Sequence, residues 1–190
     1  MRLMCEMTIA AHEREKYAAV WSLPQYHNTS PGKRHAELFG RMVQPERGLS
    51  VLDIGCGAGE GGKALKELHG LNVEYLDQVK VGSLAPFIEQ PLWKPITAKF
   101  SYGYCCDVME HIPTEFTMLC ARNMLDACEQ VFFSISFQHD HFGAYVGEAL
   151  HLTVKPFTWW RDCLGEMGQL VEARDLMGEG VFLVHGQGSR

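Results

Sequence analysis

The sequence lacks any regular cysteine spacing. It contains seven cysteines, an odd number, and no two of them are separated by the two residues of a CxxC pair. Structural zinc sites typically place cysteines about two to four residues apart, and disulfide-rich secreted domains use even sets of cysteines. We therefore expect reduced, mostly buried thiols in a cytoplasmic protein without a bound metal.

The sequence also lacks an excess of positive charge and a long apolar run. The 17 lysine and arginine residues face 23 aspartate and glutamate residues, so the formal net charge is −6. A surface that neutralises phosphates needs the opposite balance, and nucleic acid is therefore not expected as a partner. No apolar run approaches the roughly 20 residues that span a bilayer, and residues 1–17 lack the apolar stretch of a secretory signal. We expect a soluble protein with no membrane association.

What the sequence does contain is a regular alternation of short apolar runs and amphipathic segments over 190 residues. Apolar runs that end at glycine predict buried parallel strands, and apolar residues at helical spacing predict the helices between them. The last two strands have no helix between them, so they should form an antiparallel hairpin. Strands are predicted at 49–55, 72–77, 87–92, 101–109, 130–137, 169–177 and 180–186, and helices at 8–21, 33–43, 59–70, 113–128 and 156–168.

This pattern predicts an α/β fold. The sheet should be doubly wound, mostly parallel and seven-stranded, with helices on both faces and an antiparallel hairpin at the C-terminus. No repeat, low-complexity tract or linker divides the chain, so residues 1–190 are expected to form one domain. Within it, a helical segment at 1–45 precedes a core at 49–190.

The first predicted strand leads into a glycine-rich loop, Gly55-Cys56-Gly57-Ala58-Gly59, and Asp53 lies just before it. Glycines at the end of a strand let a ligand approach the backbone, because no β-carbon stands in the way. The helix that follows turns its free N–H groups towards that ligand. Asp77 ends the next predicted strand. An acid about 20 residues after such a loop can accept hydrogen bonds from both hydroxyls of a ribose.

The stretch VLDIGCGAG at 51–59 resembles the first motif of the class I, Rossmann-like, S-adenosylmethionine-dependent methyltransferases. The resemblance extends from about Leu49 to the C-terminus. It implies S-adenosylmethionine as cofactor, S-adenosylhomocysteine as product, and residues 49–190 as the cofactor-binding core. It also implies that the loop with Gly55, Cys56, Gly57 and Gly59 passes the cofactor's amino-acid tail, that Asp53 orders this loop, that Asp77 binds the ribose hydroxyls and that Gln78 lies beside the adenosine.

Two other interpretations of the loop stay open. The glycines can form a tight turn that Asp53 merely caps. Residues 57–62 also satisfy GxGxxG, the fingerprint of a nicotinamide or flavin dinucleotide site. That match begins two residues late relative to the strand and leaves Asp53 without a role. Glu60 would also repel a pyrophosphate at the start of the helix, whereas a cationic sulfonium has no such conflict.

Two further segments are candidates for the cofactor site. Asp107, Glu110 and His111 follow the strand at 101–109, and the Glu-His-apolar-Pro order resembles an element beside the cofactor's methionine end in many methyltransferases. The alternative is that Asp107 and Glu110 cap the next helix. Leu92 and Trp93 offer an apolar, stacking surface for adenine, although this segment departs from the family pattern of a clear acid and a small residue.

The methyl acceptor is expected at the loop after the strand at 130–137. His139 and His141 flank Asp140 there, and together with His111 they are candidates for a catalytic base, since histidine titrates near neutrality. His151 is expected to converge on the same pocket and bind the substrate. The triplet 139–141 is also compatible with a zinc or iron site, or with a solvated polar loop.

Residues 1–45 are expected to form a helical lid over the cleft. Tyr17, Trp21 and Tyr26 would then line the substrate mouth and exclude water from the sulfonium. The alternative is ordinary packing of these aromatic side chains between helix and sheet, which is favoured for Trp21.

The sequence thus predicts a methyltransferase that acts on a small-molecule acceptor. Another reaction of S-adenosylmethionine, of the lyase or decarboxylase type, is compatible with the same scaffold because a fold does not fix a reaction. A non-catalytic, cofactor-binding partner subunit is a third possibility. The Asn/Asp-Pro-Pro-aromatic tetrapeptide of many nucleic-acid amino-group methyltransferases is absent. The acceptor atom and the oligomeric state stay open.

Overall fold

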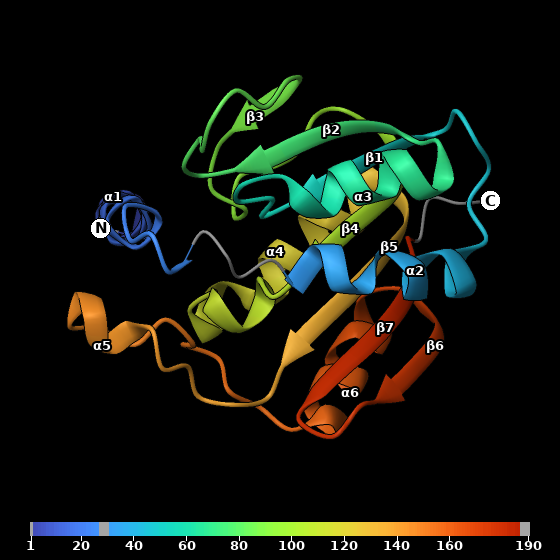
Figure 1. The fold of residues 1–190 in the computed structure, drawn as a ribbon. Helices are drawn as coiled ribbons and strands as arrows, with labels where there is room; N and C mark the ends of the chain where they lie inside the picture. The colour runs from blue at the N-terminus through green and yellow to red at the C-terminus, as the bar shows by residue number, and fades with distance from the viewer. Residues whose placement is uncertain (1, 27–30, 187–190) are drawn as a thin grey trace.

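The computed structural model describes residues 2–26 and 31–186, and the side chains of 9–26 and 32–186 (Figure 1). Its helices and strands follow the predicted order. The helical elements are α1 (Arg2–Trp21), α2 (Pro31–Val43), α3 (Glu60–His69), the 3₁₀ turn η2 (Met109–His111), α4 (Thr114–Ala127), α5 (Gly143–Val146) and α6 (Phe157–Met167). The strands are β1 (Ser50–Ile54), β2 (Asn72–Asp77), β3 (Phe87–Glu89), β4 (Phe100–Cys106), β5 (Cys128–Ser136), β6 (Gln169–Asp175) and β7 (Glu179–His185).

The strands form one seven-stranded sheet in the order β3-β2-β1-β4-β5-β7-β6. Strands β1 to β5 are parallel, while β7 runs antiparallel between β5 and β6. This arrangement confirms the predicted fold class. The strand order reverses between β1 and β4, because the chain first builds outward through β2 and β3 and then returns to the other side of β1. Doubly wound sheets bind ligands at such a switch point.

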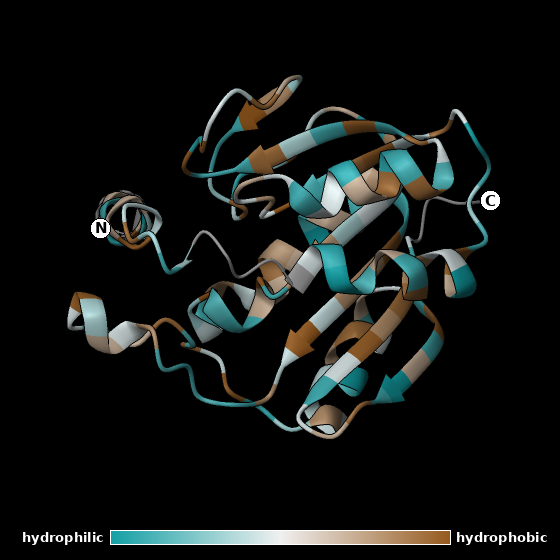
Figure 2. Ribbon diagram, viewed as in Figure 1, coloured by the Kyte–Doolittle hydropathy of each residue, from teal (hydrophilic) through white to brown (hydrophobic). Residues whose placement is uncertain are grey.

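Each face of the sheet carries its own core, because successive side chains of a strand point to opposite faces. Val51 of β1 belongs to the cluster that contains Phe39 of α2 and Leu65 of α3. Its neighbour Leu52 belongs to the larger cluster with side chains of α4 and α6, including the fully buried Trp160. Figure 2 shows the apolar residues gathered on the central strands and polar residues on the outer surfaces of α2 and α3.

Helix α1 lies beyond the carboxyl edge of the sheet, beside α5 (Figure 1, left). Two contacts between exposed side chains hold it there: Arg14 forms an ion pair with Glu89 at the end of β3, and Nε2 of His12 lies 2.7 Å from the Glu148 carboxylate just after α5. The helix therefore reaches from the end of β3 to the segment after α5. None of the helices in the described part of the chain is long and apolar enough to cross a membrane.

A few boundaries differ from the sequence predictions. Helix α1 begins at Arg2 rather than at residue 8, and β3 ends at Glu89, just before Pro91 breaks the segment. Strand β4 ends at Cys106 because Asp107 adopts a left-handed backbone with φ of 58°. The turns η2 and α5 were not predicted, since a single helical turn is too short to show apolar periodicity. Residues 27–30 of the expected lid loop lie outside the described residues.

Candidate functional site

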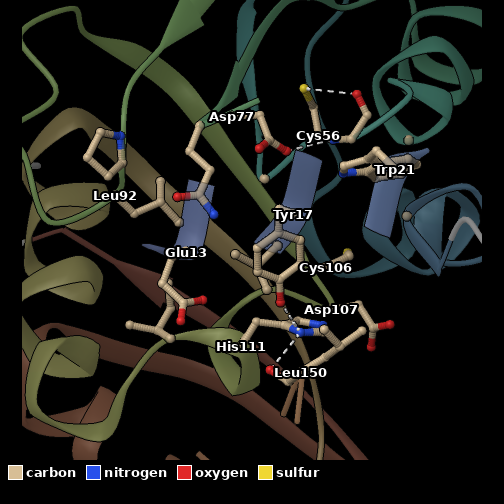
Figure 3. Close-up of a pocket in the computed structure, with 18 of the residues that line it drawn as sticks. Glu13, Tyr17, Trp21, Cys56, Asp77, Leu92, Cys106, Asp107, His111 and Leu150 are labelled. Carbon is tan, nitrogen blue, oxygen red and sulfur yellow. Dashed lines mark hydrogen bonds between the residues drawn. The ribbon is translucent and has the colours of Figure 1, made fainter. Parts of the chain in front are cut away.

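A cavity of about 400 Å³ opens at the carboxyl edge of the sheet (Figure 3). Its wall combines α1, the glycine loop after β1, the ends of β2 and β4, the segment after β3 and residues that follow β5. These segments lie far apart in the sequence and meet at the switch point of the sheet. Most of the predicted site residues line the cavity: Tyr17, Trp21, Tyr26, Asp53, Gly55, Cys56, Gly57, Asp77, Gln78, Leu92, Trp93, Asp107, His111 and His151.

Gly55 and Gly57 are required by both conformation and space. Their φ angles are +65° and +50°, in the left-handed region that favours glycine. A β-carbon at Gly55 would lie 2.4 Å from Cγ2 of Val108, and one at Gly57 would lie 2.3 Å from Cζ2 of Trp21. Close packing therefore requires glycine at both positions, with Val108 and the Trp21 ring packed against the loop.

Asp77 ties the end of β2 to this loop. Its Oδ2 accepts a hydrogen bond from the Gly57 N–H at 2.9 Å, and its Oδ1 accepts one from the Val79 N–H at 3.2 Å. Burial raises the pKa of Asp77 although these hydrogen bonds oppose it. A carboxylate has about four lone-pair positions, so Asp77 can still accept from a ligand. The side chain of the adjacent Gln78 has a buried Oε1, and this oxygen has no hydrogen-bond partner among the described residues.

Asp53 lies beneath the glycine loop, where only 5% of it is exposed. Its Oδ2 accepts a hydrogen bond from the Gly62 N–H at 2.7 Å and so joins β1 to the first turn of α3. Burial raises the pKa of Asp53 to about 7, the nearby Asp77 adds to the rise, and the Gly62 N–H opposes it. Asp53 therefore orders the loop from below.

At the other end of the cavity, Tyr17 of α1 meets His111 of η2. The Tyr17 hydroxyl lies 2.6 Å from Nδ1 of His111, and the same nitrogen lies 3.2 Å from the Leu150 carbonyl oxygen (Figure 3). The His151 ring stands edge-on to the His111 ring, with centroids 4.6 Å apart. Burial, assisted by the neighbouring His151, lowers the pKa of His111 to about 4. His111 is therefore neutral near neutral pH.

Two predicted cofactor residues lie behind the cavity wall rather than in it. Gly59, with φ of +76°, packs its Cα against the side chain of Leu84. Glu110 is fully buried, and its Oε1 accepts a hydrogen bond from the Ser136 N–H at 2.7 Å. Burial and the neighbouring Asp107 carboxylate raise the pKa of Glu110 well above its ordinary value.

His139 and His141 are not brought to the cavity, contrary to the prediction that they act there. Both side chains are exposed, and neither lines the wall. The residue between them, Asp140, is the one that turns inward. Its carboxylate accepts hydrogen bonds from the backbone N–H groups of Gly143, Leu150 and His151. Because these bonds commit Asp140 to the fold of its own loop, the triplet 139–141 does not converge on a ligand.

No protein-family model matches the sequence, and no curated protein matches it. Solved structures do match. The 1,6-didemethyltoxoflavin-N1-methyltransferase of Burkholderia thailandensis aligns with 95% of this chain and 89% of its own, at a TM-score of 0.73 and 15% identity. The N-methyltransferase NodS of Bradyrhizobium japonicum WM9 aligns with 90% of this chain and 98% of its own, at 0.64 and 14%. Magnesium protoporphyrin IX methyltransferase of Synechocystis PCC 6803 aligns with 90% of this chain and 92% of its own, at a TM-score of 0.61 and 16% identity.

The chain has the class I methyltransferase fold.

Several residues of the cavity wall were not predicted from the sequence. Glu13 lines the cavity one helical turn before Tyr17, and it forms a buried ion pair with Lys16 at 2.7 Å. Residues four positions apart share one face of a helix, so the prediction that Tyr17 lines the cavity could have been extended to Glu13. Arg34 and Phe142 also line the cavity, and no sequence pattern pointed to them.

Proposed function

We propose that the chain is an S-adenosylmethionine-dependent methyltransferase that acts on a small molecule and releases S-adenosylhomocysteine. The observation that carries this proposal is a single cavity with two distinct ends. The glycine loop, Asp77 and Gln78 line one part of it, and Tyr17, His111 and His151, which meet at the His111 ring, line another (Figure 3). A volume of about 400 Å³ falls within the range of small-molecule sites, roughly 300–1,000 Å³.

The first end fits a nucleoside with an amino-acid tail. At Gly55 and Gly57 the loop has no side chain of its own to hinder such a tail, and the Val108 and Trp21 side chains pack beside these two positions. The Asp77 carboxylate has lone pairs left for ribose hydroxyls, and the buried Oε1 of Gln78 needs a donor that the described residues do not provide. Leu92 and Trp93 add apolar surface where adenine would stack. Two of the solved structures that share this fold, the Burkholderia thailandensis and NodS methyltransferases, contain bound S-adenosylhomocysteine.

The second end would hold the methyl acceptor. S-adenosylmethionine supplies an activated methyl group, and the task of the protein is to align the acceptor for in-line displacement and to keep water away. Tyr17 and the neutral His111 offer a hydrogen-bonded pair at the wall.

We propose α1 as a lid over this end. The side chains that hold it, in the Arg14–Glu89 ion pair and the His12–Glu148 hydrogen bond, are exposed. Such pairs hold weakly, and this suits a segment that opens.

Replacing Asp77 with alanine is expected to weaken the binding of S-adenosylmethionine and S-adenosylhomocysteine by about 10- to 150-fold. This range corresponds to about 1.5–3 kcal/mol for hydrogen bonds to a charged group. Asp77→Asn should lose less, because the amide oxygen still accepts from the Gly57 N–H. Calorimetric titration of the purified protein with both compounds measures the change.

Glu74→Gln is the matched control, since Glu74 lies on the same strand and does not line the cavity. Unchanged affinity in Asp77→Ala would contradict the assignment of the ribose site. A parallel titration with NAD tests the proposed function itself, and binding of NAD alone would overturn it. That arm is necessary because Lys63 lies 2.6 Å from Glu60 and offsets the charge that would repel a pyrophosphate.

A further inference from the structure

Glu110, His111 and His151 form a compact polar cluster at the acceptor end of the cavity. One potential ligand atom of each residue lies within 4.8 Å of the others. Glu110 and His111 belong to η2, whereas His151 comes from the stretch between α5 and α6. The backbone N–H groups of Leu152 and Thr153 both donate to the Glu110 carbonyl oxygen, at 2.7 and 2.9 Å. These hydrogen bonds fix the two segments against each other and hold the cluster together.

One oxygen of the Glu110 side chain is buried without a hydrogen-bond donor. Its side chain is 0% exposed, and although Oε1 accepts from the Ser136 N–H, Oε2 has no hydrogen-bond partner among the described residues. The Asp107 carboxyl group lies within hydrogen-bonding reach of it, and burial together with this neighbour raises the pKa of Glu110, which favours its protonated form. A buried carboxylate oxygen without a donor is costly, and a second carboxylate beside it increases that cost. A proton relieves this cost when no ion is bound, and a cation that displaces the proton would relieve it as well.

The two imidazole rings are oriented as metal-binding histidines usually are. Nδ1 of His111 lies 3.2 Å from the Leu150 carbonyl oxygen and 2.6 Å from the Tyr17 hydroxyl, and Nδ1 of His151 faces the Gln138 carbonyl oxygen. A carbonyl oxygen only accepts, so the bond to Leu150 requires the N–H on Nδ1 of His111, and the Tyr17 hydroxyl then accepts from the same N–H. A histidine ligand commonly donates its second ring N–H to a backbone carbonyl, which fixes the tautomer and leaves the other nitrogen with a free lone pair. Nε2 of each ring has no hydrogen-bond partner among the described residues, so it is the nitrogen left for a ligand.

We propose that Glu110, His111 and His151 bind a divalent first-row transition-metal ion. Two imidazoles with one carboxylate suit zinc, iron or manganese rather than calcium. Bonds of about 2.0–2.2 Å bring such ligand atoms to about 3–3.5 Å from one another, so the three groups, whose candidate ligand atoms lie within 4.8 Å, would draw closer around an ion. His111 and His151 line the cavity, and the remaining coordination positions therefore face it. An oxygen or nitrogen of the methyl acceptor would bind there.

The test is metal titration of the full chain after tag removal and EDTA treatment, without S-adenosylmethionine. We expect one equivalent of Mn²⁺ or Zn²⁺ to bind, measured by calorimetry and, for Mn²⁺, by loss of the free-ion electron paramagnetic resonance signal. His151→Ala and Glu110→Gln should each weaken binding by at least about tenfold. His139→Ala removes an exposed histidine from the neighbouring loop and should leave the affinity unchanged.

Wild-type protein that binds neither ion more tightly than millimolar overturns the proposal, as do equal losses in His139→Ala and His151→Ala. If Glu110→Gln does not fold, His151→Ala decides alone, because His151 is only partly buried. The proposal goes beyond the methyltransferase function and is separable from it. A chain that binds S-adenosylmethionine but no metal keeps the function and loses the site.

Discussion

Replacing Gly57 with alanine is expected to reduce the affinity for S-adenosylmethionine by at least about 100-fold, or roughly 2.7 kcal/mol. The backbone at Gly57 has φ of +50°, a left-handed conformation that costs other residues roughly 1–2 kcal/mol. The added β-carbon would lie 2.3 Å from the Trp21 ring, so either the ring or the loop must move. Movement of the loop also disturbs the hydrogen bond from the Gly57 N–H to Asp77. Calorimetric titration of the folded variant gives the affinity.

Gly82→Ala separates backbone strain from contact with the ligand. Gly82 has φ of +70°, a β-carbon there meets nothing within 4 Å, and the residue does not line the cavity. We expect lower thermal stability and unchanged cofactor affinity in this control. The double variant Gly57→Ala with Trp21→Ala restores space but not conformation, so it should recover part of the affinity. Equal cofactor binding by Gly57→Ala and Gly82→Ala would show that the loop does not contact the cofactor.

The sheet and the glycine loop that lines the cavity were predictable because their physical signals are local. Strand β2 begins and ends at the residues predicted from the sequence, since its apolar run lies between the left-handed Gly70 and the acid Asp77. The glycine loop combines backbone conformation and close packing within a few residues, and only glycine satisfies both. The antiparallel hairpin followed from two adjacent apolar runs without a helix between them.

At the end proposed for the methyl acceptor, Tyr17, His111 and His151 were named from the sequence and line the cavity. Their contacts with one another were not predictable, because these contacts join distant residues. Tyr17 and His111 are 94 positions apart, and their pairing depends on how α1 lies across the edge of the sheet. His139 and His141 had the expected chemistry at the expected edge. Their direction, however, was decided by Asp140, which turns inward to accept three backbone N–H groups. Residue type alone does not reveal which side chain of a loop faces a cavity.

Asp53→Asn is expected to be more stable than the wild type above pH 7, by a margin that shrinks towards pH 4. Burial raises the pKa of Asp53 to about 7 in the folded chain, whereas an unfolded aspartate titrates near about 4. The folded state therefore keeps a proton that the unfolded state loses between these values. The stability due to this proton is complete below about pH 4 and is gone above about pH 7, a change on the order of 3–5 kcal/mol.

Urea unfolding of the cofactor-free protein between pH 4 and pH 8 measures this difference. Asparagine keeps an acceptor for the Gly62 N–H but carries no titrating group at this position. A constant change in stability caused by the new amide appears at every pH, and the other acids titrate in both proteins. Only a change with pH in the difference between the two unfolding free energies therefore reports on Asp53. Asp126→Asn, at an exposed position in α4, should follow the wild-type curve. A constant margin for Asp53→Asn would mean that Asp53 is ionised beneath the loop throughout, with the N–H groups of the loop and α3 outweighing its burial.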